Sequence, residues 1–163
     1  MLSRSLLLFL VVVSGLSAAA DRFSITVNAP KPTVKVGTDV TIEVVLKNTS
    51  AGNFLYGSGS KPEDQGETDY KVEVQDETSK RAPETSYGHK LRTGEDSPGQ
   101  HTVIVGSFVS FELPPGGVVK NEILVNKLYD LSKPGKYEIH VERLDDAGGA
   151  SIKSNTITIT VEK

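Results

Sequence analysis

The stretch LYDLSKPGKYEIHV, residues 128–141, decides the fold class of this chain. Its Pro134-Gly135 pair is a strong turn signal, and the residues that follow alternate between apolar and polar side chains. Such alternation is typical of a β-strand with one buried face. The stretch therefore predicts a turn followed by a strand that begins at about Tyr137.

The same stretch contains Asp130, Ser132 and His140, which are the residue types of a hydrolytic triad. Alternation, however, directs His140 outward together with Glu138 and Glu142, away from the buried face of the strand. We therefore interpret these residues as scaffold, with His140 as a solvent-facing strand residue.

Alternation extends over most of the chain, whereas apolar residues at helical spacing are nearly absent. Short strands separated by Pro, Gly, Asn and Asp clusters predict an all-β fold: a single immunoglobulin-like Greek-key β-sandwich of about seven to eight antiparallel strands, with little helix. Asn121 is the one exception to the alternation within its run. The first expected strand is residues 23–27, which APKP interrupts before the pattern continues at 34–36. The others are residues 40–46, 70–74, 109–113, 119–125, 137–141 and 157–161, with 54–57 as an optional short strand.

Three segments are less regular. Residues 101–113 form either a hairpin about Gly106-Ser107 or one bent strand with a bulge there, and we favour the bulge. The reason is that the PPGG turn, residues 114–117, and the strand after it already supply a partner for this strand. Residues 57–67 and 76–100 are predicted to be long irregular loops, which are usually functional or disordered.

Residues 1–20 have the pattern of a secretory signal peptide. Arg4 precedes the apolar run LLLFLVVVSGL, and SAAA provides small residues for cleavage before Asp21. The apolar run is shorter than the roughly 20 residues that span a bilayer, and no later stretch could span one. We expect one domain, residues 21–163, that is secreted or periplasmic and has no membrane association after cleavage.

Composition narrows the class of protein further. The chain has no cysteine, so an exported domain must be stabilised by packing of its side chains and not by disulfides. Its formal net charge is −3, which argues against nucleic acid as a partner because that binding needs a basic surface.

No motif predicts catalysis or a transition-metal site. His89 and His101 bracket the second long loop, but the chain contains no H-x-H and no H-E-x-x-H pattern. YGSGSK, residues 56–61, lacks the spacing and the following helix of a nucleophile elbow. We therefore predict no enzyme, no cofactor and no catalytic residue.

Calcium is the one cation that the sequence leaves open, as a weak possibility. EDQGETD, residues 63–69, has the composition of a calcium loop without its D-x-D-x-D-G spacing. LDDAGG, residues 144–149, carries Asp145 and Asp146 but is explained more simply as a hairpin loop with Gly148 and Gly149 at positive φ.

Asn48-Thr49-Ser50 forms a glycosylation sequon. The sequence leaves two alternatives open for it: a modified asparagine in a host that glycosylates exported proteins, or a turn after the strand at residues 40–46.

Residues 109–161 resemble bacterial immunoglobulin-like domains of exported proteins, including the CARDB and BsuPI proteinase-inhibitor-like groups. The resemblance rests on LPPGG, on LYDLSKPGKYEIHV and on KSNTITITV, with a further likeness in VKVGTDVTIEVVLKNTS, residues 34–50. It implies an immunoglobulin-like sandwich and transfers no catalytic residue. By comparison with a tyrosine corner, Tyr137 should be a buried ring whose hydroxyl bonds nearby backbone, while Leu128 and Leu131 close the end of the sandwich.

The leading hypothesis for function is a non-catalytic, exported immunoglobulin-like module for binding or assembly, which acts through its inter-strand loops. Its partner would be a protein or a cell-envelope component. The predicted contact patch is Tyr87, His89, Lys90 and Arg92, in the loop of residues 76–100. The alternatives are an inhibitor of a secreted protease and, third, a hydrolytic enzyme using His89 or His101 with a loop carboxylate.

Overall fold

The fold was analysed in a computed structural model that describes residues 21–58, 67–97, 100–101, 109–145 and 149–163. The strands are β1 (Phe23–Asn28), β2 (Thr33–Lys35), β3 (Thr41–Asn48), β4 (Phe54–Ser58), β5 (Lys71–Asp76), β6 (Glu95–Ser97), β7 (Gln100–His101), β8 (Val109–Leu113), β9 (Val118–Leu124), β10 (Gly135–Leu144), β11 (Ser151–Lys153) and β12 (Ile157–Glu162). The helices are α1 (Ser86–Thr93) and α2 (Val125–Leu128).

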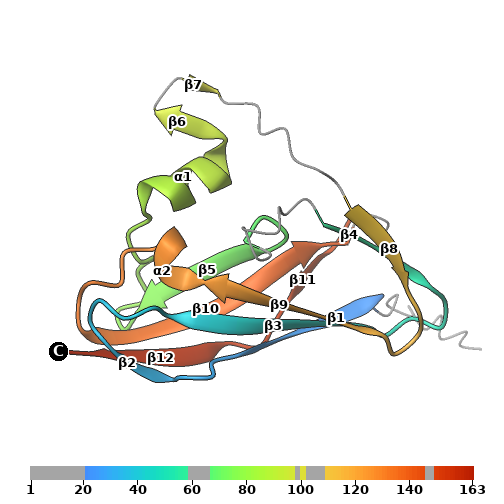
Figure 1. The fold of residues 1–163 in the computed structure, drawn as a ribbon, viewed down its shortest axis with the longest axis horizontal. Coiled ribbons are helices and arrows are strands. Elements are labelled where there is room, and N and C mark those ends of the chain that lie inside the picture. Colours follow the sequence, from blue (N-terminus) through green and yellow to red (C-terminus); the bar gives the residue numbers. More distant parts are fainter. Residues whose placement is uncertain (1–20, 59–66, 98–99, 102–108, 146–148) are drawn as a thin grey trace, which may run out of the picture.

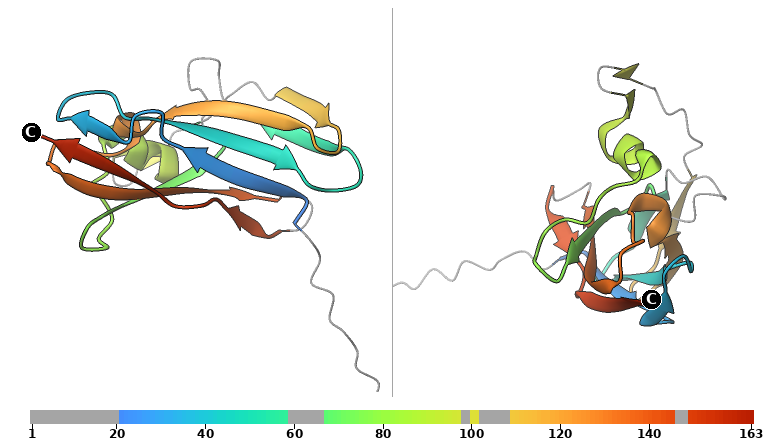
Figure 2. Two further views of the ribbon diagram at one scale, coloured as in Figure 1. Left: turned by 90° about the horizontal axis from the view of Figure 1, so that it is seen from below. Right: turned by 90° about the vertical axis from the view of Figure 1, so that its left-hand side faces the viewer.

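Two sheets pack face to face and confirm the predicted all-β sandwich (Figures 1 and 2). One sheet has the order β1-β3-β9, and all of its pairings are antiparallel. In the other, the long strand β10 pairs with β5 along one edge and with β12 and β11 along the other. Strand β2 closes this second sheet by pairing in parallel with β12.

The core lies between the two sheets and consists of the alternating residues that the sequence pattern identified. Strand β1 has the burial pattern buried-exposed throughout, and β3 buries every second residue. Full burial of an aliphatic side chain contributes about 1.5–3 kcal/mol, so this layer supplies the main stabilisation of a chain without cysteine. Its fully buried members include Phe23, Val27, Ile42, Val44, Leu46, Val74, Ile123, Ile139, Val141 and Ile159.

The stretch that opens β10 behaves as predicted. The ring of Tyr137 is buried, and its hydroxyl donates a 2.8 Å hydrogen bond to the carbonyl oxygen of Lys133. Leu128 and Leu131 are also buried at this end of the sandwich. The hydroxyl of Tyr137 therefore ties the turn before β10 to the start of the strand.

Replacing Tyr137 by phenylalanine removes this hydrogen bond and leaves the ring in place. We expect a loss of about 1 kcal/mol in the free energy of unfolding and a melting temperature about 2–4 °C lower. Thermal unfolding followed by circular dichroism measures the change. A melting temperature equal to that of the unchanged protein would contradict a structural role for the hydroxyl.

The prediction that residues 76–100 form an irregular loop is wrong. Helix α1 lies within this segment and β6 follows it. Thr85 is the N-cap, and its side-chain oxygen accepts a hydrogen bond from the N–H of Gly88 at 3.0 Å. Gly94 ends the helix in the left-handed conformation, with φ of 72°, and its N–H bonds the carbonyl of Lys90.

The prediction that β8 pairs with the strand after the PPGG turn is also wrong. Strand β8 pairs with β4, while β9 pairs with β3. The reason is that the turn is fixed to the end of β3: the N–H of Gly116 bonds the carbonyl of Asn48, and the N–H of Asn48 bonds the carbonyl of Gly117. The chain thus enters β9 alongside β3. Phe111, expected on a buried face, is 44% exposed, and its ring centre lies 5.2 Å from that of Tyr56 on β4.

Several predictions concern residues outside those that the structure describes. They include the signal peptide of residues 1–20, the bulge at Gly106-Ser107 and residues 59–66 of the first long loop. Of the helices in the described part of the chain, neither has the length and apolar character needed to cross a membrane.

Candidate functional site

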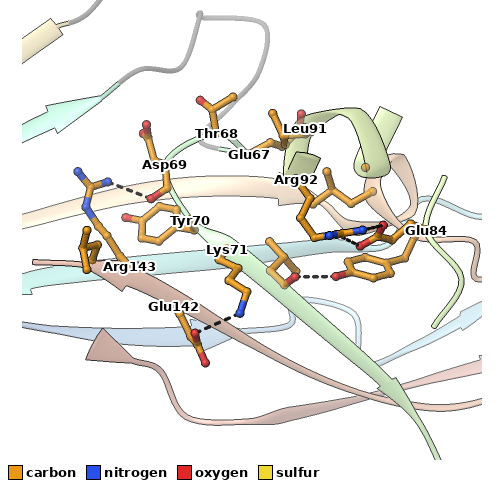
Figure 3. A pocket seen from close by; sticks show the side chains of 15 residues that line it. Glu67, Thr68, Asp69, Tyr70, Lys71, Glu84, Leu91, Arg92, Glu142 and Arg143 are labelled. Atoms are coloured by element: carbon orange, nitrogen blue, oxygen red, sulfur yellow. Dashed lines mark hydrogen bonds and ion pairs between the residues drawn. The ribbon is translucent and has the colours of Figure 1, made fainter. Parts of the chain in front are cut away.

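A cavity of about 460 Å³ opens between the edge of β5 and helix α1 (Figure 3). Its apolar lining comes from four separate elements and is closed by two tyrosines. Charged side chains from β5, β10 and α1 surround this lining. The apolar residues are Val72, Leu91, Leu128 and Leu144, and the tyrosines are Tyr70 and Tyr129.

Helix α1 forms one wall because its first turn is fixed to the end of α2. The N–H of Thr85 donates to the carbonyl of Leu128 at 3.0 Å, and the Thr85 hydroxyl donates to the carbonyl of Lys127 at 2.6 Å. Gly88 permits this approach, since a Cβ placed on it would lie 2.1 Å from the carbonyl oxygen of Leu128. A glycine at this helical position is therefore required by packing and not by backbone conformation.

Glu67 fixes the opposite side of the cavity to α1. Glu67 is only 3% exposed, and its carboxylate accepts a 3.0 Å hydrogen bond from the hydroxyl of Tyr87. The same carboxylate forms an ion pair with the ammonium of Lys127 at 2.7 Å. The ammonium of Lys127 also lies 4.7 Å from the centre of the Tyr87 ring. A buried carboxylate with a cation and a hydroxyl as partners avoids the desolvation penalty of an unpaired charge.

The charged groups at the rim are paired with one another. Arg92 donates two hydrogen bonds to the carboxylate of Glu84, at 2.6 and 3.0 Å. The hydrogen bond from Arg92 holds the pKa of Glu84 below its usual value. Across β5, Lys71 contacts Glu142 of β10 at 3.6 Å. These pairs leave an apolar floor with charges of both signs at its border, which suits an amphipathic ligand.

At one end of the cavity, where Arg143 and Tyr70 line it, a cluster of polar groups surrounds Arg143. Its guanidinium lies 4.5 Å from the ring centre of Tyr56 and 5.6 Å from that of Tyr70, and it donates to the carbonyls of Asp69 and Gly57. Burial raises the pKa of Tyr70 well above its usual value.

Asn121 completes this cluster and explains the break in the alternation of β9. Its side-chain oxygen accepts hydrogen bonds from the hydroxyls of Tyr56 and Tyr70, at 3.3 and 3.2 Å. An apolar residue here would leave both hydroxyls without this acceptor, so the exception is a polar contact inside the sandwich. In the sequence, the break in alternation at Asn121 was the sign of this polar contact.

The four residues of the predicted contact patch all lie on helix α1, and their side chains differ in exposure. Tyr87 is half-buried against the core and bonds Glu67, as described above. His89 is 45% exposed, with Nδ1 3.4 Å from Glu84. Lys90 is half-buried, and its carbonyl accepts the capping bond of Gly94. Of the four, Arg92 alone lines the cavity.

His140 is on the predicted outer face of β10 but is not freely exposed. Its side chain is 12% exposed, and Nε2 lies 3.6 Å from Glu142. Burial lowers the pKa of His140. Glu73 of β5 is directly opposite His140 in the strand register, and the low exposure of the ring corrects the interpretation of a solvent-facing residue.

The calcium candidates are engaged in other contacts where the structure describes them. Glu67 is held by Tyr87 and Lys127, and Asp145 is buried with an ion pair of 3.2 Å to Arg22. Gly149 has φ of 66°, as predicted for the hairpin loop. Within the described residues, no group of three His, Cys, Asp or Glu side chains could hold a metal ion.

The sequon is in the turn that the sequence left as one of its alternatives. Asn48 is 1% exposed, and its side-chain nitrogen donates to the carbonyls of Gly52 and Leu113 at 2.9 and 2.8 Å. Its side-chain oxygen accepts from the backbone and hydroxyl of Ser50. A glycan on this nitrogen is incompatible with the folded chain.

Comparison with known proteins adds little to these observations. No protein-family model and no curated protein sequence matches the chain. Among solved structures, the alkylpurine DNA glycosylase AlkC of Pseudomonas fluorescens, bound to DNA containing an abasic site analog, has a TM-score of 0.41 and 12% identity over 87% of this chain and 31% of its own.

A β-glucosidase from Listeria innocua is similar at the same level. Its complexes with isofagomine and with glucose have TM-scores of 0.41 and 0.40 and identities of 15% and 13%, over 86% of this chain and 16% of theirs. The chain thus spans less than a third of the length of each of these proteins. Likeness this low carries no argument about function.

Proposed function

We propose that the protein is a non-catalytic, exported immunoglobulin-like module that binds a segment of a protein partner in the cavity between β5 and α1. The observation that carries the proposal is the cavity itself. It has the size of a ligand pocket, an apolar floor, and charged groups that are already paired.

The immunoglobulin-like assignment is supported by strand order. The sheet β1-β3-β9 corresponds to the A-B-E order of that fold, and β5-β10-β12 corresponds to C-F-G. The hydroxyl of Tyr137 bonding backbone four residues upstream matches the tyrosine corner at the start of strand F. The signal-like pattern of residues 1–20 supports export.

An extended peptide suits the cavity because one wall is the edge of a strand. The carbonyl of Val72 accepts a 2.7 Å hydrogen bond from the hydroxyl of Tyr129, so it points away from β10. The N–H of Val72 points to the same side, because both groups of a strand residue share one direction. A peptide strand could accept from this N–H while an apolar side chain occupies the floor.

The proposal is tested with a variant that fills the cavity at an exposed position. Leu144 lines the cavity and is 56% exposed, so replacing it by tryptophan should not disturb the core. Leu55 on β4 is 62% exposed and is absent from the cavity lining, so Leu55→Trp is the matched control. Peptides are first selected on the unchanged protein by phage display.

We expect Leu144→Trp to weaken binding of the selected peptides about tenfold or more in calorimetric titrations, while Leu55→Trp leaves the affinity unchanged. Failure to enrich any peptide, or equal affinity for Leu144→Trp and the unchanged protein, would count against the cavity as the binding site.

A further inference from the structure

Strand β9 is an edge strand, and its pairing with β3 determines which of its backbone groups point outward. The N–H of Val125 bonds the carbonyl of Val40 at 2.8 Å, and the N–H of Asn48 bonds the carbonyl of Gly117 at 2.9 Å. Because hydrogen-bonded pairs alternate along an antiparallel ladder, the odd-numbered residues of β9 bond β3. The even-numbered residues direct their N–H and C=O groups to the open edge.

The open edge is continuous over the centre of the strand. No hydrogen bond joins the backbone of Lys120 or Glu122 to another described residue on this side. The side chains of Val118, Lys120 and Glu122 are exposed on the outer face of the sheet, and Val118 is 46% exposed. Unpaired strand edges of this kind are templates for pairing with another strand.

Two other strand edges are covered at one of their central residues by contacts within the chain. At β1, the N–H and C=O of Val27 bond the side-chain amide of Asn155 at 2.8 and 3.0 Å. At β5, the carbonyl of Val74 accepts from the N–H of Ala82 at 2.9 Å. On β9, by contrast, no contact of this kind from the described residues meets the outward backbone groups of Lys120 or Glu122.

We propose that β9 pairs with β9 of a second copy of this chain, antiparallel, about a twofold axis at Asn121. In this register Lys120 is opposite Glu122 of the other copy, and Val118 is opposite Leu124. Each charge faces its opposite and each apolar side chain faces an apolar one, so the strand is complementary to itself. Opposite charges directly across an antiparallel pair stabilise it, and a twofold axis makes each contact occur twice.

The register also satisfies the backbone. Lys120 and Glu122 both point outward, so opposed across the axis they form a hydrogen-bonded pair that exchanges two bonds. The twofold axis repeats this pair and joins the two sheets of order β1-β3-β9 into one continuous sheet. A register shifted by one residue would oppose outward groups to inward ones and would lose these bonds.

Sedimentation velocity from about 1 μM to about 1 mM tests the pairing, since this range covers weak and moderate affinities. We expect the unchanged protein to form dimers within this range. Lys120→Glu places like charges opposite each other twice and should weaken the dimer about tenfold or more. The double variant K120E/E122K exchanges the charges and should restore it. Lys47→Glu, on the same face of β3, is the matched control and should have no effect.

Cross-linking tests the register independently of charge. The chain has no cysteine, so K120C and E122C introduce the only thiols. Opposed Cα atoms in a hydrogen-bonded pair are about 5.5 Å apart, within the range of a disulfide. Mixing the two variants under mild oxidation should give a covalent heterodimer, and mixing K47C with E122C should not. A monomer at every concentration, dimers of K120E as stable as those of the unchanged protein, or no heterodimer would overturn the proposal.

Discussion

Replacing Asn48 by aspartate is expected to destabilise the folded chain by about 3–5 kcal/mol at neutral pH. The side-chain nitrogen of Asn48 donates to the carbonyl oxygens of Gly52 and Leu113, and the residue is 1% exposed. Aspartate has the same shape, but the carboxylate oxygen that replaces the amide nitrogen would face both carbonyl oxygens and would have no hydrogen to donate to them. The substitution would also weaken the backbone hydrogen bonds between residue 48 and the PPGG turn, which direct the chain into β9.

The pH dependence of the stability of Asn48→Asp tests whether ionisation of the new carboxyl group causes the loss of stability. Because the folded state disfavours the ionised form, the pKa of the new carboxyl is expected to be higher when folded than when unfolded. The loss of stability should therefore be smallest below about pH 4, where both states are protonated, and should grow as the pH rises. Urea unfolding at several pH values measures it. Asn28→Asp, at an exposed position of β1, is the control and should change stability by less than about 0.5 kcal/mol.

Asn48→Ala separates the charge from the lost contacts. It removes the same hydrogen bonds without adding a carboxylate, so we expect a loss of about 2–3 kcal/mol that does not vary with pH in this range. Equal losses for aspartate and alanine at neutral pH would contradict the proposed arrangement of donors and acceptors around Asn48.

Replacing Gly88 by alanine is expected to detach helix α1 from α2 and to abolish the cavity. The new Cβ would lie 2.1 Å from the carbonyl oxygen of Leu128, a backbone atom that also accepts from Thr85. Alanine favours an isolated helix by about 1 kcal/mol over glycine, so a loss of stability cannot come from helix propensity. Overpacking at such a site costs about 1–3 kcal/mol.

Hydrogen exchange and thermal unfolding together measure this effect. In Gly88→Ala, we expect amides of α1 to exchange rapidly while those of β3 and β10 remain protected, because the helix detaches without unfolding the sandwich. Gly52→Ala is the control, since a Cβ there has no neighbour within 4 Å. A Gly88→Ala protein with an unchanged melting temperature and a protected α1 would contradict the close packing of the two helices.

Alternation predicted the sandwich correctly because each strand buries one face against the opposite sheet. The hydrogen bond of Tyr137 was predicted by a different route, the resemblance to a tyrosine corner, and the structure has both the buried ring and the bond to nearby backbone. Leu128 and Leu131 are buried at the end of the sandwich, where they were expected. The pairing of β8 was predicted wrongly because it depends on Asn48, which is distant from β8 in the sequence and close to it in space.

The candidate site was missed because short-range patterns describe it poorly. Helix α1 spans eight residues, and the sequence signals of its ends are the N-cap Thr85 and the C-cap Gly94. The surrounding residues have the polar composition of a loop, so these two signals were not recognised as helix ends. Isolated helices of this length are marginal in water, so α1 depends on its tertiary contacts at Gly88 and Leu128. Arg143, on the last part of β10, meets Tyr56 and Tyr70 only in the folded chain.

The central proposal is that the cavity between β5 and α1 is the ligand site. Intermolecular nuclear Overhauser effects between a selected peptide and methyl-labelled protein test it most directly. We predict contacts to the methyl groups of Val72, Leu91 and Leu128, all of which line the cavity. Contacts confined to exposed methyl groups elsewhere, such as those of Val36 and Leu55, would contradict it.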